Sequence, residues 1–177
     1  RGYFLFFCSG MMANSMGSVL SYMRNPSYGY GIDSAFQGIM SSAAQIGGLF
    51  ANLLSGYLPF YIGRKKSAFL LAICPLIGLV LMILTGNPYL LIMSFYLEGT
   101  GKGINSNISN IIVNQCAEKK TIGQNLLHSF FAVGAILGPI IMTSLVESKW
   151  RLCLSFVLVL LSIAVFLLGT SSLSNEK

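Results

Sequence analysis

Six long apolar stretches, separated by short polar breaks, constrain the fold of this chain more than any other feature. A membrane-spanning helix needs about 20 mostly apolar residues. The stretches are continuous and do not alternate between apolar and polar residues, which favours helices over the strands of a membrane barrel. We therefore predict an all-α membrane protein whose six transmembrane helices span residues 2–22, 35–60, 67–86, 89–115, 122–146 and 151–170.

The composition excludes an ordinary soluble domain. Hydrophobic residues make up 54% of the chain and charged residues only 9%, against about 25% charged residues in soluble domains. The net charge of +6 is spread over several loops, which is typical of topology signals and not of a nucleic-acid surface. The four cysteines lie far apart and there is one histidine, so we predict no metal site and no cofactor.

The break at residues 56–67 carries Arg64, Lys65 and Lys66 in a row. Loops rich in lysine and arginine lie on the cytoplasmic side of a membrane. With this loop in the cytoplasm, seven basic residues fall on the cytoplasmic side and three on the other. We therefore predict a bundle over residues 1–170 with both ends in the cytoplasm (N-in, C-in), followed by a polar cytoplasmic tail at 171–177.

Three helices followed by three more place the second triplet upside down relative to the first. This layout is compatible with a 3+3 inverted repeat, which many transporters use. The residues support the repeat only weakly: 52–56 and 134–138 are both small, glycine-bearing stretches, and little else matches. Small residues at such spacings let helices pack closely, and we assign Gly134, Gly138 and Pro139 to helix packing.

The predicted helix over 89–115 has one polar and one apolar half when its residues are placed at 100° intervals. Glu98, close to the middle of the membrane, and Lys102 are its charged residues. A charge at this depth costs at least about 2.5–3.5 kcal/mol, so it faces a bundle interior or a wet cavity. The two residues can neutralise each other at their four-residue spacing or form a substrate or proton site, and the two interpretations are not exclusive, since a ligand can open a paired charge. The polar half also holds Gly99, Gly103, Asn105, Asn107, Ser109, Asn110 and Asn114, and the arc that suits lipid holds Leu97, Ile104, Ile108, Ile111 and Ile112.

The other helices contribute fewer polar candidates. Asn14 and Asn52 carry amides that need hydrogen-bond partners in hydrocarbon. His128 fits either a hydrogen-bonded packing residue or a titrating one. The residues that we assign to a solute or ion path are Glu98, Lys102, Asn105, Asn110, Asn14, Asn52 and His128.

Three stretches follow the patterns of a known transporter family. In the first, the matching positions are Gly56, Leu58, Gly63, Arg64 and Lys65. The second is 125–139, NLLHSFFAVGAILGP, and the glycines of 99–103 precede it. The first stretch resembles the loop between helices two and three of the major facilitator superfamily, and the others look like helices five and four of its fucose-permease-type sugar transporters. The resemblance implies alternating access between two six-helix bundles, so the chain looks like the N-terminal half of a twelve-helix transporter.

The chain departs from these patterns at three positions. The family loop has aspartate where this chain has Phe60 and arginine where it has Tyr61. In helix four, Ser106 stands where the fucose permeases carry a carboxylate. The loop therefore points to ancestry and orientation more than to a charged gate, and Glu98, about two turns earlier, is a candidate substitute for the missing acid.

We predict from these observations a secondary active transporter of the cell membrane that moves a small polar organic solute, such as a sugar. Its partners would be the solute, a coupling proton or sodium ion, the lipid bilayer and a second six-helix half. The alternative is a non-transporting or truncated membrane protein, or an assembly subunit, of the same fold. An enzyme is disfavoured, because Ser55-Gly56 lacks the pattern of a serine nucleophile and no two aspartates lie within the predicted helices. A pore is disfavoured as well, because nothing resembles a selectivity filter.

Overall fold

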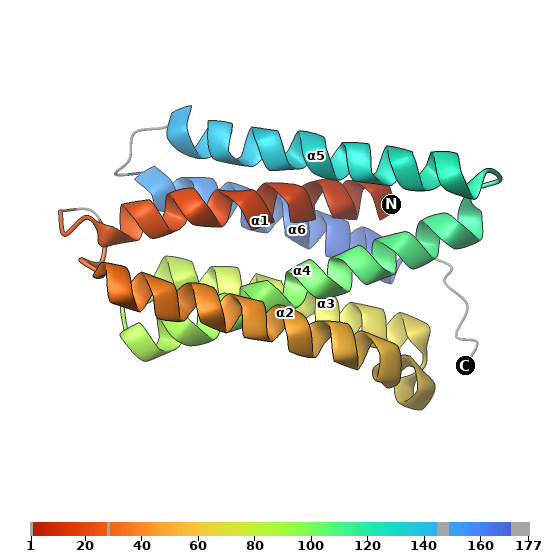
Figure 1. The fold of residues 1–177 in the computed structure, drawn as a ribbon, viewed down its shortest axis with the longest axis horizontal. Helices are drawn as coiled ribbons and strands as arrows, with labels where there is room; N and C mark the ends of the chain where they lie inside the picture. The colour runs from red at the N-terminus through yellow and green to blue at the C-terminus, as the bar shows by residue number, and fades with distance from the viewer. Residues whose placement is uncertain (1, 28, 145–148, 171–177) are drawn as a thin grey trace.

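The protein is an all-helical bundle in the part of the chain that the structure, a computed structural model, describes: residues 2–27, 29–144 and 149–170 (Figure 1). These residues form six helices and no strand. The helices are α1 (Gly2–Arg24), α2 (Ser34–Ile62), α3 (Arg64–Leu84), α4 (Pro88–Cys116), α5 (Lys120–Ser144) and α6 (Trp150–Gly169). The end predicted for the fifth helix, at 146, and the tail at 171–177 lie outside the described residues.

Local sequence explains where several helices begin and end. The Asp33 carboxylate accepts a hydrogen bond from the Phe36 amide at 2.7 Å and caps the start of α2. Asn87 caps α4 in the same way, with Pro88 in the first turn. Gly63 has a φ of +85°, which glycine adopts without strain, and this single residue separates α2 from α3. The third helix therefore begins at Arg64, three residues before the predicted 67.

Four of the six helices are long and apolar enough to cross a membrane by length and composition: α1, α5, α6 and the Lys66–Leu84 part of α3. The helices α2 and α4 are not among them, although each has 29 residues. In α4 the reason is its polar content, which consists of Glu98, Lys102 and the amides and serines that follow them. Six membrane spans therefore stay a prediction, which the exposed Leu49, Phe50 and Leu53 of α2 support.

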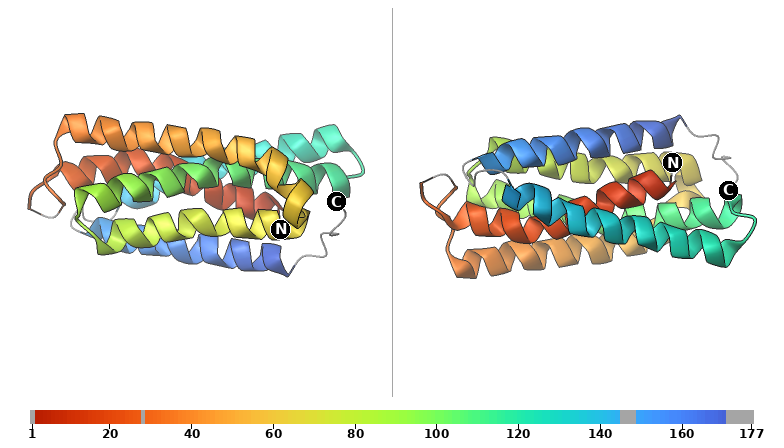
Figure 2. Two further views of the ribbon diagram at one scale, coloured as in Figure 1. Left: turned by 90° about the horizontal axis from the view of Figure 1, so that it is seen from below. Right: turned by 90° about the horizontal axis from the view of Figure 1, so that it is seen from above.

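The helices run alternately up and down the bundle. The start of α1 lies at the same end as the α2–α3 and α4–α5 connections, and α6 ends there too (Figure 1). This is the arrangement that the distribution of basic residues requires, while the orientation in the membrane stays a prediction. Helices α3 and α6 lie on one side of the bundle and α2 lies on the opposite side (Figure 2). Between them the core is closed by side chains that are almost completely buried, such as Met12, Leu79, Phe95 and Leu161.

Helices α1 and α5 form one closely packed pair. A Cβ atom at Gly10 would collide with the Phe131 carbonyl oxygen, and one at Gly134 would collide with the Phe7 carbonyl oxygen. At Gly138 it would lie 2.5 Å from the Met11 carbonyl oxygen. The glycines thus let the two backbones touch, as small residues do in membrane helices. Pro139 lies within α5 and is half-buried.

Helices α2 and α4 form a second pair of the same kind. A Cβ atom at Gly47 would collide with the Tyr96 carbonyl oxygen, and one at Gly99 would collide with the Ala44 carbonyl oxygen. One turn further along, a Cβ atom at Gly103 would lie 2.8 Å from the Asn52 side-chain oxygen. The backbone of α4 is therefore held against α2 over more than one turn.

An aromatic cluster ties the α1–α2 connection to α3 and α6. The Tyr30 hydroxyl donates a hydrogen bond to the Met82 carbonyl at 3.0 Å. The Tyr30 ring meets the Trp150 ring edge-on at 5.7 Å, and the Arg151 guanidinium lies 5.0 Å from the Tyr30 centroid. A cation over an aromatic face is attracted by the ring quadrupole. The cluster closes the end of the bundle opposite the α2–α3 loop.

We expect Tyr30→Ala to lower the thermal unfolding midpoint of the purified protein clearly more than Tyr30→Phe. The phenylalanine variant loses one hydrogen bond, worth about 1 kcal/mol, and keeps both ring contacts. The alanine variant also loses the contacts with Trp150 and Arg151. The control is Tyr89→Ala, because Tyr89 is exposed at the start of α4. Equal midpoints for Tyr30→Ala and Tyr89→Ala would contradict the cluster.

Candidate functional site

Glu98 and Lys102 form an ion pair in the middle of α4. The Lys102 Nζ lies 3.5 Å from Glu98 Oε1. The Glu98 side chain is 0% exposed and that of Lys102 is 35% exposed. No described residue donates a hydrogen bond to either carboxylate oxygen. Gly78 of α3 lies against this turn, because a Cβ atom there would be 3.0 Å from the Glu98 nitrogen. The carboxylate is therefore inside the bundle, and the ammonium reaches it from a more open side.

Asn105 and Ser109 continue the stripe of Glu98 along α4. Both side chains are 0% exposed, and neither amide atom of Asn105 nor the Ser109 hydroxyl has a hydrogen-bond partner among the described residues. The neighbouring Gly101 lies against Pro75 of α3 and Met12 of α1. Glu98 and Asn105, both predicted to line a path, thus lie in the bundle interior and not on its surface.

The predicted lipid-facing arc of α4 is wrong at two positions. Ile104 and Ile108 are buried, while Ile111 is 45% exposed. The reason is tertiary, because α4 packs against both α2 and α3, and Ile104 and Ile108 line the same cavity as Ser55 of α2 and Leu71 of α3. Helical periodicity separates a polar from an apolar half, but it does not distinguish an apolar half covered by protein from one covered by lipid.

A second polar row lies on the open side of α4. Lys102, Ser106 and Asn110 follow one another at four-residue intervals, and all three are half-buried. Asn110 Nδ2 donates to Ser106 Oγ at 3.5 Å, and Gln124 of α5 donates to the Asn110 carbonyl at 3.4 Å. Side chains four residues apart lie on one helix face. The row therefore presents an ammonium, a hydroxyl and an amide to the same side.

The structure does not gather the remaining predicted path residues at the ion pair. Asn14 is exposed on α1, and its amide donates to the Gly10 carbonyl of its own helix at 3.4 Å. His128 is exposed on α5, and its ring meets Phe6 edge-on at 5.7 Å. Asn52 is exposed on α2 and bonds to α4 elsewhere. These three residues stay predictions as path residues.

The sequence did not reveal the polar contact between α2 and α4. The Asn107 amide donates to the Ser55 hydroxyl at 2.6 Å and to the Asn52 side-chain oxygen at 3.3 Å. The available signal is spacing, because Asn52 and Ser55 are three residues apart and share a face of α2. Choosing Asn107 as their partner requires knowing that α2 packs against α4.

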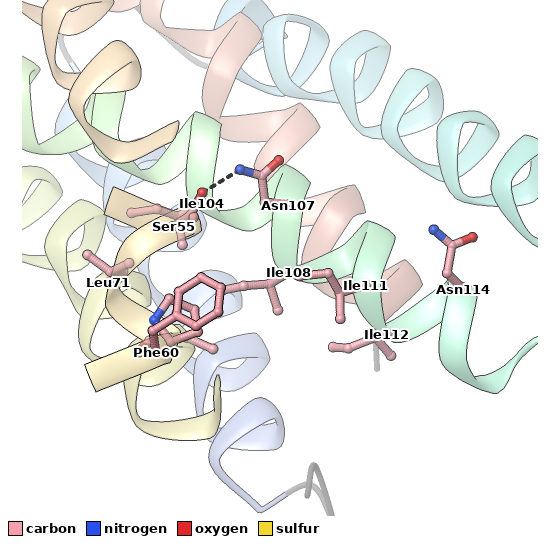
Figure 3. Close-up of a pocket in the computed structure, with 13 residues that line it drawn as sticks. Ser55, Phe60, Leu71, Ile104, Asn107, Ile108, Ile111, Ile112 and Asn114 are labelled. Carbon is pink, nitrogen blue, oxygen red and sulfur yellow. Dashed lines mark hydrogen bonds between the residues drawn. The ribbon is translucent and has the colours of Figure 1, made fainter. Parts of the chain in front are cut away.

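A cavity of about 440 Å³ lies between the end of α2, the start of α3 and the second half of α4 (Figure 3). Its walls are mostly apolar and include Pro59, Leu71 and Ile108. Gly56 and Phe60 of the loop pattern also line it, and Phe60 is 73% exposed. Leu58 packs against the core. Arg64 and Lys65 open α3, but their side chains lie outside the described part of the structure.

The described residues do not form a metal centre of the usual kind. Across 2–27, 29–144 and 149–170, no three His, Cys, Asp or Glu side chains gather in a way that could hold a metal ion. Within this part of the chain, the group with the most distinctive chemistry is the buried carboxylate of Glu98 with its partly open lysine partner.

Comparison with known proteins places the chain in a family. No curated protein matches it. The model of one family, described as the Major Facilitator Superfamily, matches residues 2–176. Members of this family are membrane transporters and not enzymes, in agreement with a multi-pass helical chain. Because the match covers almost the whole sequence, the chain belongs to the Major Facilitator Superfamily.

Proposed function

We propose that this chain is the N-terminal six-helix half of a secondary active transporter in the cell membrane. It moves a small polar organic solute, with sugars as the first class to test, by alternating access and together with a proton or a sodium ion. The observation that carries the proposal is the Glu98–Lys102 ion pair in the middle of α4, where the acid is buried and the base is partly exposed. Charges at such depth are costly and mark substrate or ion pathways in membrane proteins.

The packing of the two helix pairs supports an inverted repeat within this half. Exchanging α1 with α4 and α2 with α5 converts one pair into the other. Gly10 then takes the place of Gly99, and Gly134 takes the place of Gly47, each against a backbone carbonyl. The spacing supports the same register, because the carbonyl that each glycine meets lies three residues before the partner glycine on the facing helix. This register matches 134–138 with 47–51 and not with 52–56.

The exposed polar residues of the other helices fit a second half across the path. Asn14 on α1, Asn52 on α2 and His128 on α5 are exposed in the described chain. An amide that faces lipid lacks hydrogen-bond partners, so such residues favour a wet cavity or a protein partner. We propose that a second six-helix bundle, in the same chain or in a dimer mate, covers these residues.

We expect Glu98→Gln to abolish the dependence of uptake on a proton gradient. The test measures uptake of labelled sugars by cells or liposomes that contain the full-length protein, with and without an imposed pH gradient. Glutamine keeps the size of the side chain and cannot exchange a proton. The other Asp, Glu, Lys, Arg or His side chains within the described helices, away from the helix ends, are Lys102 and His128.

The matched control is Glu118→Gln, because Glu118 is exposed between α4 and α5. It is expected to leave uptake unchanged. Unaltered transport and pH dependence in Glu98→Gln would remove Glu98 from the mechanism. Absence of uptake of any tested solute by the unmodified protein would favour a non-transporting member of the fold.

A further inference from the structure

We propose that the solute is an anion whose carboxylate binds Lys102 and whose hydroxyl or amide groups bind Ser106 and Asn110. This inference rests on the proposed function and names its substrate class. It also gives the two charged residues of α4 different roles. Lys102 contacts the solute, and Glu98 positions the lysine through their ion pair.

The first step of the argument is the sign of the accessible charge. Away from the helix ends, Glu98 and Lys102 are the only Asp, Glu, Lys or Arg residues in the spans. The acid is completely buried, whereas the lysine side chain is 35% exposed. A solute on the open side of α4 therefore meets a positive charge, which attracts an anion and repels a cation. In a site of low dielectric this preference is stronger than in water.

The second step is the geometry of the ion pair. The distance of 3.5 Å between Nζ and Oε1 is longer than the roughly 2.7–2.9 Å of a charge-assisted hydrogen bond. Neither carboxylate oxygen of Glu98 accepts a hydrogen bond from a described residue. A lysine that served only to neutralise Glu98 would be buried with it and bonded to it. Lys102 instead has a partly open side chain with a flexible stem, which lets its ammonium turn to a second carboxylate.

The third step is the row that continues from Lys102. Ser106 and Asn110 lie one and two turns further along the same face and are also half-buried. Eight residues of helix rise by about 12 Å, so a solute of one or two turns in length reaches from the ammonium to the hydroxyl or the amide. The contact between Asn110 and Ser106 is at the limit of a hydrogen bond, at 3.5 Å. Both side chains thus have donors and acceptors for solute hydroxyls.

The test compares three solutes that share the same sugar ring and differ in charge: an anion, a neutral sugar and a cation. The purified full chain, in lipid nanodiscs, is titrated with D-glucuronate, D-glucose and D-glucosamine while its thermal unfolding midpoint is measured. A ligand that binds the folded state raises the midpoint. We expect half-saturation by glucuronate at a concentration at least about tenfold lower than by glucose. The reason is that a hydrogen bond to a charged group contributes more net free energy than a neutral one, and the difference corresponds to about a tenfold change in affinity. Glucosamine is expected to be the weakest.

The variants assign the preference to Lys102. Lys102→Arg keeps the charge and is expected to keep the preference for glucuronate, and Lys102→Met is expected to lose it. Because Lys102→Met leaves Glu98 without a counter-charge, the double variant Glu98→Gln/Lys102→Met provides a neutral pair that folds more readily. It too is expected to lose the preference. Lys119→Met, in an exposed loop, is the control and should bind like the unmodified protein.

Several outcomes would overturn the inference: no shift with glucuronate, equal shifts with glucose, or unchanged glucuronate binding by the double variant. They are distinguishable from failure of the proposed function. If glucose is taken up with a proton gradient but glucuronate does not bind, the proposed transport function is supported and the anion site is refuted. If glucuronate binds through Lys102 and no gradient drives uptake, the anion site is supported and the proposed transport function is refuted.

Discussion

Replacing Gly99 by alanine is expected to separate α2 from α4 and to destabilise the bundle strongly. The added Cβ atom would collide with the Ala44 carbonyl oxygen and lie 2.6 Å from its carbonyl carbon. These are backbone atoms, so no side chain can turn away to make room. Overpacking of a tight contact typically costs about 1–3 kcal/mol and occasionally more, and a backbone collision belongs at the upper end.

The measurement is the free energy of unfolding of the purified protein, obtained by titration with a denaturing detergent. Gly17→Ala in α1 and Gly38→Ala in α2 are matched controls, because a Cβ atom at either position has no heavy atom within 4 Å. Alanine is the better helix former by about 0.8–1.0 kcal/mol, so both controls are expected to be neutral or slightly stabilising. If Gly99→Ala behaved like them, the close approach of α2 and α4 would be wrong.

Gly10→Ala extends the same experiment to the α1–α5 pair. Its Cβ atom would meet the Phe131 carbonyl oxygen, and the Ala135 nitrogen would lie 3.1 Å away. If α1–α5 and α2–α4 are repeats of one unit, Gly10→Ala and Gly99→Ala should cost similar amounts. A large cost at one glycine and none at the other would argue against the inverted repeat.

The helices were predictable because their signals are local. Apolar runs of membrane length, the caps at Asp33 and Asn87, and the break at Gly63 are properties of neighbouring residues. The one consistent error concerns which helix covers which face. Ile104 suits lipid and protein equally well, and only the positions of the neighbouring helices decide between them.

The candidate site was predictable in its chemistry and not in its layout. The spacing of Glu98 and Lys102 predicted the ion pair, since four residues make one turn. It did not predict that the acid would be buried and the base partly open. That difference arises because α3 approaches with Gly78 at the turn of Glu98. A side chain's accessibility is set by such long-range contacts, which single-sequence periodicity does not contain.

Lys102→Met is expected to cost far more stability than Glu98→Gln, and this asymmetry tests the roles of the two residues. Without Lys102, the Glu98 carboxylate is a buried charge with neither a counter-charge nor a hydrogen bond from any described residue. Removing one partner of a buried pair costs roughly 3–5 kcal/mol. In Glu98→Gln the remaining lysine is partly open and can turn its ammonium outward, so the cost is expected to be well below that figure.

A double-mutant cycle on the free energy of unfolding measures the coupling. The double variant Glu98→Gln/Lys102→Met has no unpaired charge and is expected to recover most of the stability that Lys102→Met loses. Equal costs for the two single variants would mean that both charges are equally confined, and additive costs would mean that they do not interact. The expected asymmetry makes Glu98 the fixed partner and Lys102 the movable one. Such a lysine can pair with the solute while the solute is bound and with Glu98 after the solute leaves. The Lys102 ammonium is then never without a counter-charge.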